Sequence, residues 1–144
     1  CSQQQIMIRT LLAILLVSTA CLSAEATLGF DLSYFQGQVS QSSFDCLADS
    51  GYEFGIIQAT AGTGGYNPYA ASDISRGKEA GICCLDVYIF PDTSESASSS
   101  MTTLINNLLD DGALTNNMVW MDIEGTQYWS SSCSSNQSWL SEAI

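Results

Sequence analysis

Residues 118–125, MVWMDIEG, form an apolar run that carries two carboxylates, Asp122 and Glu124, and then ends at a glycine. In a β-strand, residues i and i+2 point to the same face, so the two side chains are expected to stand side by side, about 6–7 Å apart. Like charges that close cannot both ionise easily, so one acid keeps its proton for a leaving oxygen. The pair suits glycosidic bond hydrolysis, although taken alone it also fits two solvated loop carboxylates.

Upstream of this run, strand-like segments alternate with helix-like segments, which is the pattern of βα units around a parallel sheet. Strands are expected at 28–32, 54–59 and 82–90 as well as in the run itself, and helices at 41–50, 69–79, 103–109 and from about residue 139. Two serine-rich stretches, 92–100 and 130–135, are expected to be loops. The sequence therefore predicts an α/β fold.

Side chains suited to sugar recognition fall where these strands end. Asp31 ends the first strand, Tyr88 and Phe90 end the third, and Asp122 and Glu124 end the fourth. In a β/α barrel the carboxyl ends of the strands meet at one face, where the chemistry gathers. Aromatic rings stack on sugar faces and carboxylates bind hydroxyls, so these residues predict a carbohydrate cleft. Each has a simpler explanation too, as a turn or cap residue for Asp31 and as core for the aromatic pair.

The composition of the chain limits which functions and which catalytic groups are possible. The chain has 144 residues, of which 46% are apolar, enough for one domain with a core. After residue 26, only Arg76 and Lys78 are basic, against fourteen acidic residues, which argues against nucleic-acid partners. The acidity fits an acidic compartment and plain solubility equally well. Because the chain has no histidine, His-dependent triads and His bases are excluded, and carboxylates must carry any reaction without a cofactor.

Residues 1–26 are expected to be upstream residues followed by a secretory signal peptide. A basic start precedes the apolar run 11–17, which is too short to span a bilayer, and Ala24 and Ala26 stand where signal peptidase reads small residues. Cleavage there would leave a mature chain that starts at Thr27. We therefore expect a protein without a membrane anchor, secreted or in the lumen of a lysosome or phagosome.

Four cysteines remain after that cut, and an even number in a secreted chain favours disulfides. Cys83 and Cys84 are each expected to pair with Cys46 or Cys133, because a bridge between neighbours strains the peptide. A structural metal is not expected, since the chain lacks both histidine and a paired Cys-x-x-Cys motif.

Several segments follow one another in the order found in a known family. These are GFDLSYFQG at 29–37, QATAG at 58–62, YIF at 88–90 and MDIE at 121–124. Together they resemble the opening motif, second strand, third strand and catalytic strand of the family 25 glycoside hydrolases, the Chalaropsis-type lysozymes. The opening motif combined with the later Asp-x-Glu is fairly specific. Gln58 departs from the pattern, because the family more often has lysine there.

The resemblance implies a modified TIM-like β/α barrel. The family's domain has five βα units followed by three further strands, and about the first four units are recognisable in this chain. Residues 27–144 are thus expected to be the N-terminal part of such a domain. A monomer is expected.

The resemblance also implies an N-acetylmuramidase that hydrolyses the β-1,4 bond between N-acetylmuramic acid and N-acetylglucosamine in bacterial peptidoglycan, for digestion or for defence against bacteria. By matching position, Glu124 would be the general acid. Asp122 and Asp31 would stabilise positive charge on the sugar, or orient its acetamido group or a water. Tyr88 and Phe90 would line the sugar subsite.

Two alternatives remain. The chain could be a sugar-binding or regulatory fragment that keeps Asp31, Tyr88 and Asp122 without hydrolysing its ligand. It could also be another barrel hydrolase, such as a chitinase with an Asp-x-x-Asp-x-Asp-x-Glu strand. Asn117 and Trp120 stand where that motif needs acids, which disfavours the chitinase.

Overall fold

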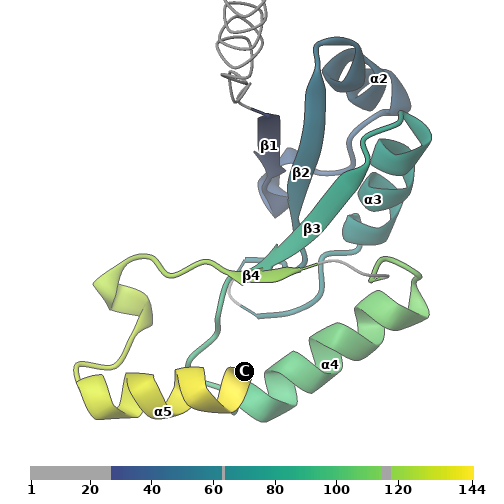
Figure 1. The fold of residues 1–144 in the computed structure, drawn as a ribbon. Helices are drawn as coiled ribbons and strands as arrows, with labels where there is room; N and C mark the ends of the chain where they lie inside the picture. Colours follow the sequence, from purple (N-terminus) through teal and green to yellow (C-terminus); the bar gives the residue numbers. More distant parts are fainter. Residues whose placement is uncertain (1–26, 63, 115–117) are drawn as a thin grey trace, which may run out of the picture.

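The computed structural model describes residues 27–62, 64–114 and 118–144. Within these ranges, strands and helices alternate along the chain, with two short 3₁₀ helices beside them (Figure 1). The elements are, in order, β1 (Leu28–Leu32), η1 (Tyr34–Gln36), α2 (Gln41–Asp49), β2 (Tyr52–Gln58), α3 (Ala70–Glu79), β3 (Cys84–Ile89), α4 (Ala97–Asp110), β4 (Val119–Met121), η2 (Thr126–Tyr128) and α5 (Cys133–Ala143).

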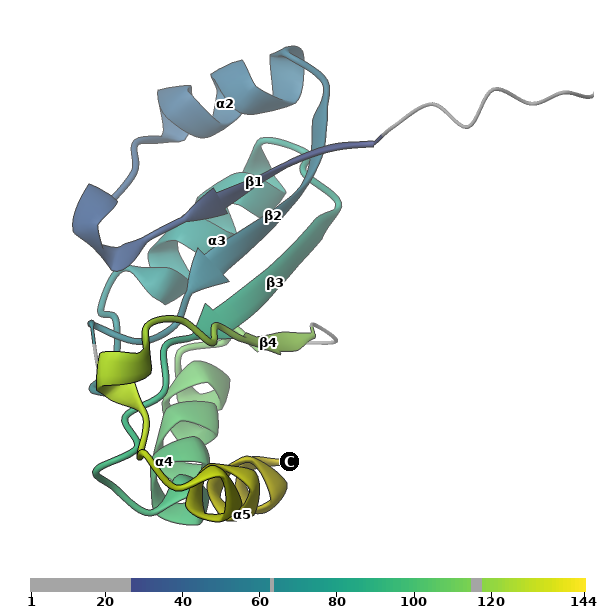
Figure 2. The ribbon, with the colours of Figure 1, turned by 90° about the vertical axis from the view of Figure 1, so that its left-hand side faces the viewer.

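The strands form one parallel sheet in the order β1-β2-β3-β4. Parallel neighbours need crossover connections, and α2, α3 and α4 provide them. Helices α2 and α3 cover the same face of the sheet, whereas α4 and α5 pack side by side beyond β4 (Figure 1, Figure 2). The α/β fold predicted from the sequence is thus confirmed, with all carboxyl ends of the strands at one edge.

The hydrophobic core lies where the helices α2, α3 and α4 pack against the sheet. Leu85, Val87 and Ile89 alternate along β3 and are buried, as expected for side chains on one covered face. Phe44 of α2 is fully buried, and Gly77 of α3 lies against both Phe44 and Leu85. A Cβ at Gly77 would lie 2.7 Å from Cδ1 of Leu85, so glycine is what allows α3 to approach the sheet this closely.

A buried carboxylate fixes the segment that precedes α2. Asp73 of α3 accepts a hydrogen bond from the Val39 N–H at 3.1 Å, and Nη1 of Arg76 donates to the Val39 carbonyl at 2.6 Å. Burial raises the pKa of Asp73, while the Val39 hydrogen bond and the Arg76 charge, 3.8 Å away, oppose that rise. The three residues tie the start of α2 to α3.

Two helices begin earlier than the sequence indicates. Helix α4 starts at Ala97 rather than at residue 103, and α5 starts at Cys133 rather than near residue 139. Serine residues that cap the two helices explain why both starts were expected too late in the chain. The side chains of Ser96 and Ser132 accept hydrogen bonds from the backbone N–H three residues on, and thereby cap the helices. Serine-rich stretches that suggested loops therefore contain helix starts.

The cysteines differ from the expected disulfides. All four described cysteines are free and exposed. Neither Cys83 nor Cys84 is bonded to Cys46 or Cys133. Sγ of Cys83 instead lies 3.2 Å from Sγ of its neighbour Cys84.

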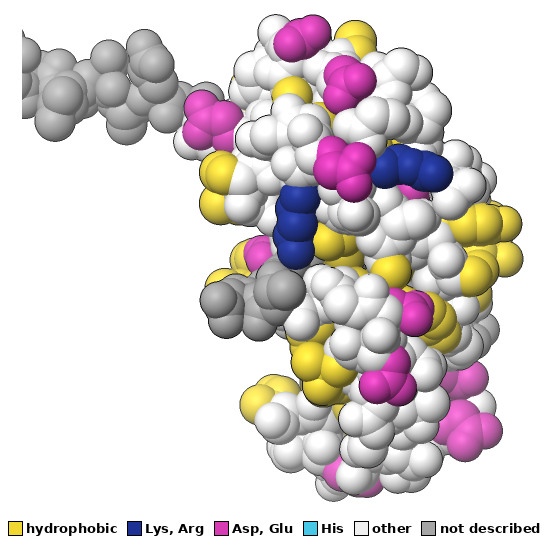
Figure 3. All heavy atoms as spheres, turned by 90° about the vertical axis from the view of Figure 1, so that its right-hand side faces the viewer, with side chains coloured by type: hydrophobic (Ala, Val, Ile, Leu, Met, Phe, Trp, Pro, Cys, Tyr) yellow, Lys and Arg dark blue, Asp and Glu magenta, His cyan; other side chains and the backbone are white. Residues whose placement is uncertain are grey.

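Positive charge is confined to one helix among the described residues. Both basic side chains, Arg76 and Lys78, come from the last turn of α3, and Figure 3 shows acidic side chains close to the basic ones. Cations near the carboxyl end of a helix interact favourably with its dipole. None of the described helices has the length and apolarity needed to cross a membrane. The expected signal peptide lies outside the described residues.

Candidate active site

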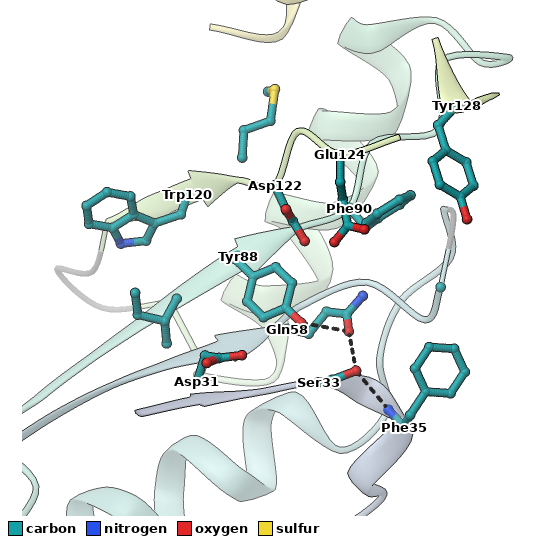
Figure 4. Close-up of a pocket in the computed structure, with 13 residues that line it drawn as sticks. Asp31, Ser33, Phe35, Gln58, Tyr88, Phe90, Trp120, Asp122, Glu124 and Tyr128 are labelled. Carbon is teal, nitrogen blue, oxygen red and sulfur yellow. Dashed lines mark hydrogen bonds between the residues drawn. The ribbon is translucent and has the colours of Figure 1, made fainter. Parts of the chain in front are cut away.

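A cleft of about 870 Å³ opens at the carboxyl ends of the strands. All five site residues predicted from the sequence line it, namely Asp31, Tyr88, Phe90, Asp122 and Glu124 (Figure 4). They come from β1, from the end of β3 and from the segment after β4. The parallel topology therefore brings together side chains that are up to 93 positions apart in the chain.

The acidic pair does not lie within a strand, contrary to the prediction. β4 ends at Met121, and only the Asp122 N–H, which donates to the Ile89 carbonyl at 2.9 Å, continues the pairing with β3. The two carboxyl groups nevertheless interact, because the charge of Asp122 acts on Glu124 and both residues line the cleft. Figure 4 shows both directed into the cleft. Ile123 between them is 59% exposed.

The proximity of the two acids affects the pKa of Glu124. The negative charge of Asp122 raises the pKa of Glu124, and the hydrogen bond between them and slight desolvation add to that rise. The raised pKa favours a proton on Glu124. Such a pair matches the requirement for a general acid beside a carboxylate.

Tyr88 joins the two sides of the cleft. Its ring lies between Asp31 on one side and the acidic pair on the other (Figure 4). Burial raises the pKa of the Tyr88 hydroxyl; a hydrogen bond with Ser33 opposes the rise, and the charges of the three carboxylates add to it. Tyr88 thus remains a neutral hydrogen-bonding group near all three acids.

Gln58 organises the floor of the cleft, a role that sequence reasoning missed. It is 4% exposed, and its Oε1 accepts hydrogen bonds from Ser33 Oγ at 3.2 Å, Tyr34 N at 2.8 Å and the Tyr88 hydroxyl at 3.0 Å. Its own carbonyl accepts from Nδ2 of Asn67 at 2.7 Å. The available signal was a polar residue at the end of an apolar strand, which often marks a buried hydrogen-bonding role.

Replacing Gln58 with leucine should destabilise the protein. Gln58→Leu keeps the volume but removes the acceptor shared by three donors, at a cost of about 1–3 kcal/mol for each donor left buried and unsatisfied. Urea unfolding followed by circular dichroism measures the change. Gln36→Leu, at an exposed position, is the matched control and should alter stability by less than about 0.5 kcal/mol. Equal stability of the two variants would contradict this role.

Further aromatic side chains line the cleft and were not predicted. Phe35 is 80% exposed, and Tyr128 packs its ring at 89° to that of Phe90 with centroids 4.9 Å apart. Trp120 is anchored by its Nε1, which donates to Oδ2 of Asp86 at 2.9 Å. Trp120 precedes Asp122 by two residues, so the alternation of a strand could have placed it on the same face.

The charge and polarity of the cleft limit its chemistry. None of the described residues that line it is basic, and the part of the chain that is described holds no group of three or more metal-binding side chains. Carboxylates, hydroxyls and exposed rings are the available groups. This combination suits a neutral sugar polymer better than a phosphorylated ligand.

The fold and the site together define the class of protein. It is a parallel βα domain that holds an acid pair and aromatic rings in a cleft at the carboxyl ends of its strands. The chain belongs to the lysozyme-like protein 1 family, whose model matches residues 23–144. Together with the curated relatives described next, this match confirms the resemblance to family 25 lysozymes.

Curated relatives from Dictyostelium discoideum agree with this assignment. The protein named Probable GH family 25 lysozyme 2 is 40% identical over 90 residues, which cover 62% of this chain and 42% of that protein. Probable GH family 25 lysozyme 5 is 29% identical over 134 residues, or 92% of this chain and 61% of the relative. Counting factor 50 is 31% identical over 136 residues, or 92% and 44%. The chain thus spans about half the length of these relatives.

Proposed function

We propose that this protein is a lysozyme that hydrolyses the β-1,4 bond between N-acetylmuramic acid and N-acetylglucosamine in bacterial peptidoglycan. The observation that carries the proposal is the acid pair in the cleft, where Asp122 raises the pKa of Glu124. Glu124 acts as the general acid that protonates the leaving oxygen. Relatives named as family 25 lysozymes support the same reaction.

The remaining residues of the cleft support the charge that develops on the sugar. In a glycosidase, the transition state resembles an oxocarbenium ion, which negative groups stabilise. Asp122 and Asp31 supply that charge from opposite sides of Tyr88, or orient the acetamido group of the substrate or a water. Tyr88 and Phe90 present hydroxyl and ring surface to the sugar.

The fold and the location belong to the same proposal. The four-stranded parallel sheet is part of a modified TIM-like barrel whose further strands would close around the cleft. Residues 27–144 form the N-terminal part of that domain, and residues 1–26 direct the chain to the secretory pathway. The protein then acts as a monomer on bacterial walls, outside the cell or in a lysosomal or phagosomal lumen.

A second candidate is a protein that binds peptidoglycan without cleaving it. The similarity to Counting factor 50, whose name is not that of a lysozyme, favours keeping this candidate. Incubation with purified peptidoglycan separates the two. Soluble fragments appear if the chain hydrolyses the polymer, whereas chain that sediments with intact polymer and releases nothing indicates binding alone.

The proposal makes a prediction about pH. A general acid works in its protonated form, so the rate is highest below the raised pKa of Glu124 and falls as the pH rises through it. Asp122→Asn removes the main cause of the shift, so the pKa of Glu124 falls and the high-pH limb of kcat/KM moves to lower pH. The position of this high-pH limb is measured from the initial rates at which soluble fragments are released from peptidoglycan across the pH range.

Asp49→Asn is the control for this pH profile, because Asp49 is exposed at the end of α2 and does not line the cleft. The high-pH limb of kcat/KM for Asp49→Asn should coincide with that of the unmodified chain. A high-pH limb that stays in place in Asp122→Asn would contradict the coupling of the two acids.

A further inference from the structure

A pair of neighbouring thiols lies at the amino-terminal end of β3, at the opposite end of that strand from Tyr88. Cys83 precedes the strand, Cys84 is its first residue, and both are exposed. Their Sγ atoms lie 3.2 Å apart. Adjacent residues in an extended strand normally direct their side chains to opposite faces, so the strand's start must deviate locally to bring these sulfurs together.

Neighbouring groups hold the two thiols in this arrangement. Sγ of Cys83 donates to the carbonyl oxygen of Glu53 on β2 at 3.3 Å, which fixes its side chain against the adjacent strand. The hydrogen bond with Cys83 raises the pKa of Cys84, and the negative charges of Asp86 and Glu53 add to that rise. The other two described cysteines lie on α2 and α5.

We propose that Cys83 and Cys84 form a reversible disulfide with each other by exchange with small-molecule disulfides such as oxidised glutathione. The thiolate of one cysteine attacks the small disulfide, forms a mixed disulfide and releases one small thiol. The second cysteine loses its proton and attacks the mixed disulfide, which releases the second small thiol. The protein loses two protons and two electrons, and the small disulfide gains them.

The bond is reversible because adjacency strains it. Successive Cα atoms are about 3.8 Å apart across a trans peptide, whereas disulfide-bonded cysteines usually have Cα atoms about 4.4–6.8 Å apart. Strained and exposed disulfides are the ones most readily reduced. Oxidation also removes the hydrogen that Cys83 donates to Glu53, so one contact between β2 and β3 is lost. The pair is therefore a site of reversible modification and differs from a permanent structural bridge.

Peptide mapping tests the pairing directly. The 144-residue chain is equilibrated with glutathione at a series of oxidised-to-reduced ratios, its free thiols are alkylated, and it is cleaved after acidic residues. Cleavage after Glu79 and Asp86 yields residues 80–86, AGICCLD, which contain both cysteines and no other. At oxidising ratios we expect this peptide to be unalkylated and lighter by two hydrogen atoms, and at reducing ratios to carry two alkyl groups.

Two variants show which cysteines form the disulfide. The double variant Cys46→Ser, Cys133→Ser should show the same oxidised peptide at the same ratios, because neither residue takes part. Cys84→Ser should abolish it and leave Cys83 alkylated or bound to one glutathione. The proposal is overturned if residues 80–86 become linked to a peptide that holds any other cysteine of the chain. It is equally overturned if both cysteines remain alkylated, or each carries its own glutathione, at every ratio.

Discussion

Glu124→Gln is expected to lower the rate of peptidoglycan hydrolysis by about 10²–10⁴-fold, the usual contribution of a general acid. Glutamine has nearly the same size as glutamate but cannot give an acidic proton to the leaving oxygen. Glu124 is exposed in the cleft and its carboxyl group serves no buried contact, so the fold should persist. Release of soluble muropeptides per unit time, with circular dichroism to verify folding, measures the effect.

Glu79→Gln provides a matched control for this substitution. Glu79 ends α3, is exposed, and accepts a hydrogen bond from Ser75, its neighbour one helical turn away. It does not line the cleft. The same chemical change there should leave the rate unchanged. If folded Glu124→Gln hydrolyses peptidoglycan as fast as Glu79→Gln, Glu124 is not the general acid.

Phe44→Ala is expected to destabilise the protein by about 3–5 kcal/mol, the range for truncating a buried phenylalanine. Phe44 is fully buried on α2, its ring centroid lies 6.2 Å from that of Phe30 on β1, and it contacts the position where Gly77 brings α3 against the sheet. The substitution opens a cavity at the junction of two helices and the sheet. Since whole domains are stable by only about 5–15 kcal/mol, much of the protein would unfold at moderate urea concentrations.

Phe35→Ala is the matched control for stability, because that ring is 80% exposed and leaves no cavity. Its free energy of unfolding should change by less than about 0.5 kcal/mol. Urea titrations of the three chains, followed by far-ultraviolet circular dichroism, give the comparison. A Phe44→Ala variant as stable as Phe35→Ala would show that the core lies elsewhere.

The sheet could be predicted because its pattern is local. The strand at Leu28–Leu32 was expected with the same bounds, and the alternation of βα segments correctly indicated parallel strands. The meeting of Asp31 with Asp122 and Glu124 followed from that topology, since parallel strands end at one edge. The acid pair still reaches the cleft although β4 is shorter than expected, because the Asp122 N–H donates to the Ile89 carbonyl and so keeps the chain beside β3.

Other features depend on contacts that no local pattern encodes. Gln58 is bonded to Ser33, Tyr34 and Tyr88, which lie 24 to 30 positions away in the chain, so its role emerges only once β1, β2 and β3 are paired. The starts of α4 and α5 were missed because serine favours both loops and helix caps, and the choice depends on the backbone that follows. The proximity of the Cys83 and Cys84 sulfurs likewise reflects local geometry that a general argument from strain did not anticipate.

Product analysis tests the proposed reaction most directly. Purified peptidoglycan is incubated with the folded chain at acidic and at neutral pH, the new reducing ends are labelled by reduction, and the fragments are identified by mass spectrometry. A muramidase must leave N-acetylmuramic acid at the new reducing end, so we expect fragments that end in its reduced form, with more of them at the acidic pH. Fragments that end in reduced N-acetylglucosamine, or a folded chain that releases no fragments at either pH, would contradict the proposed activity.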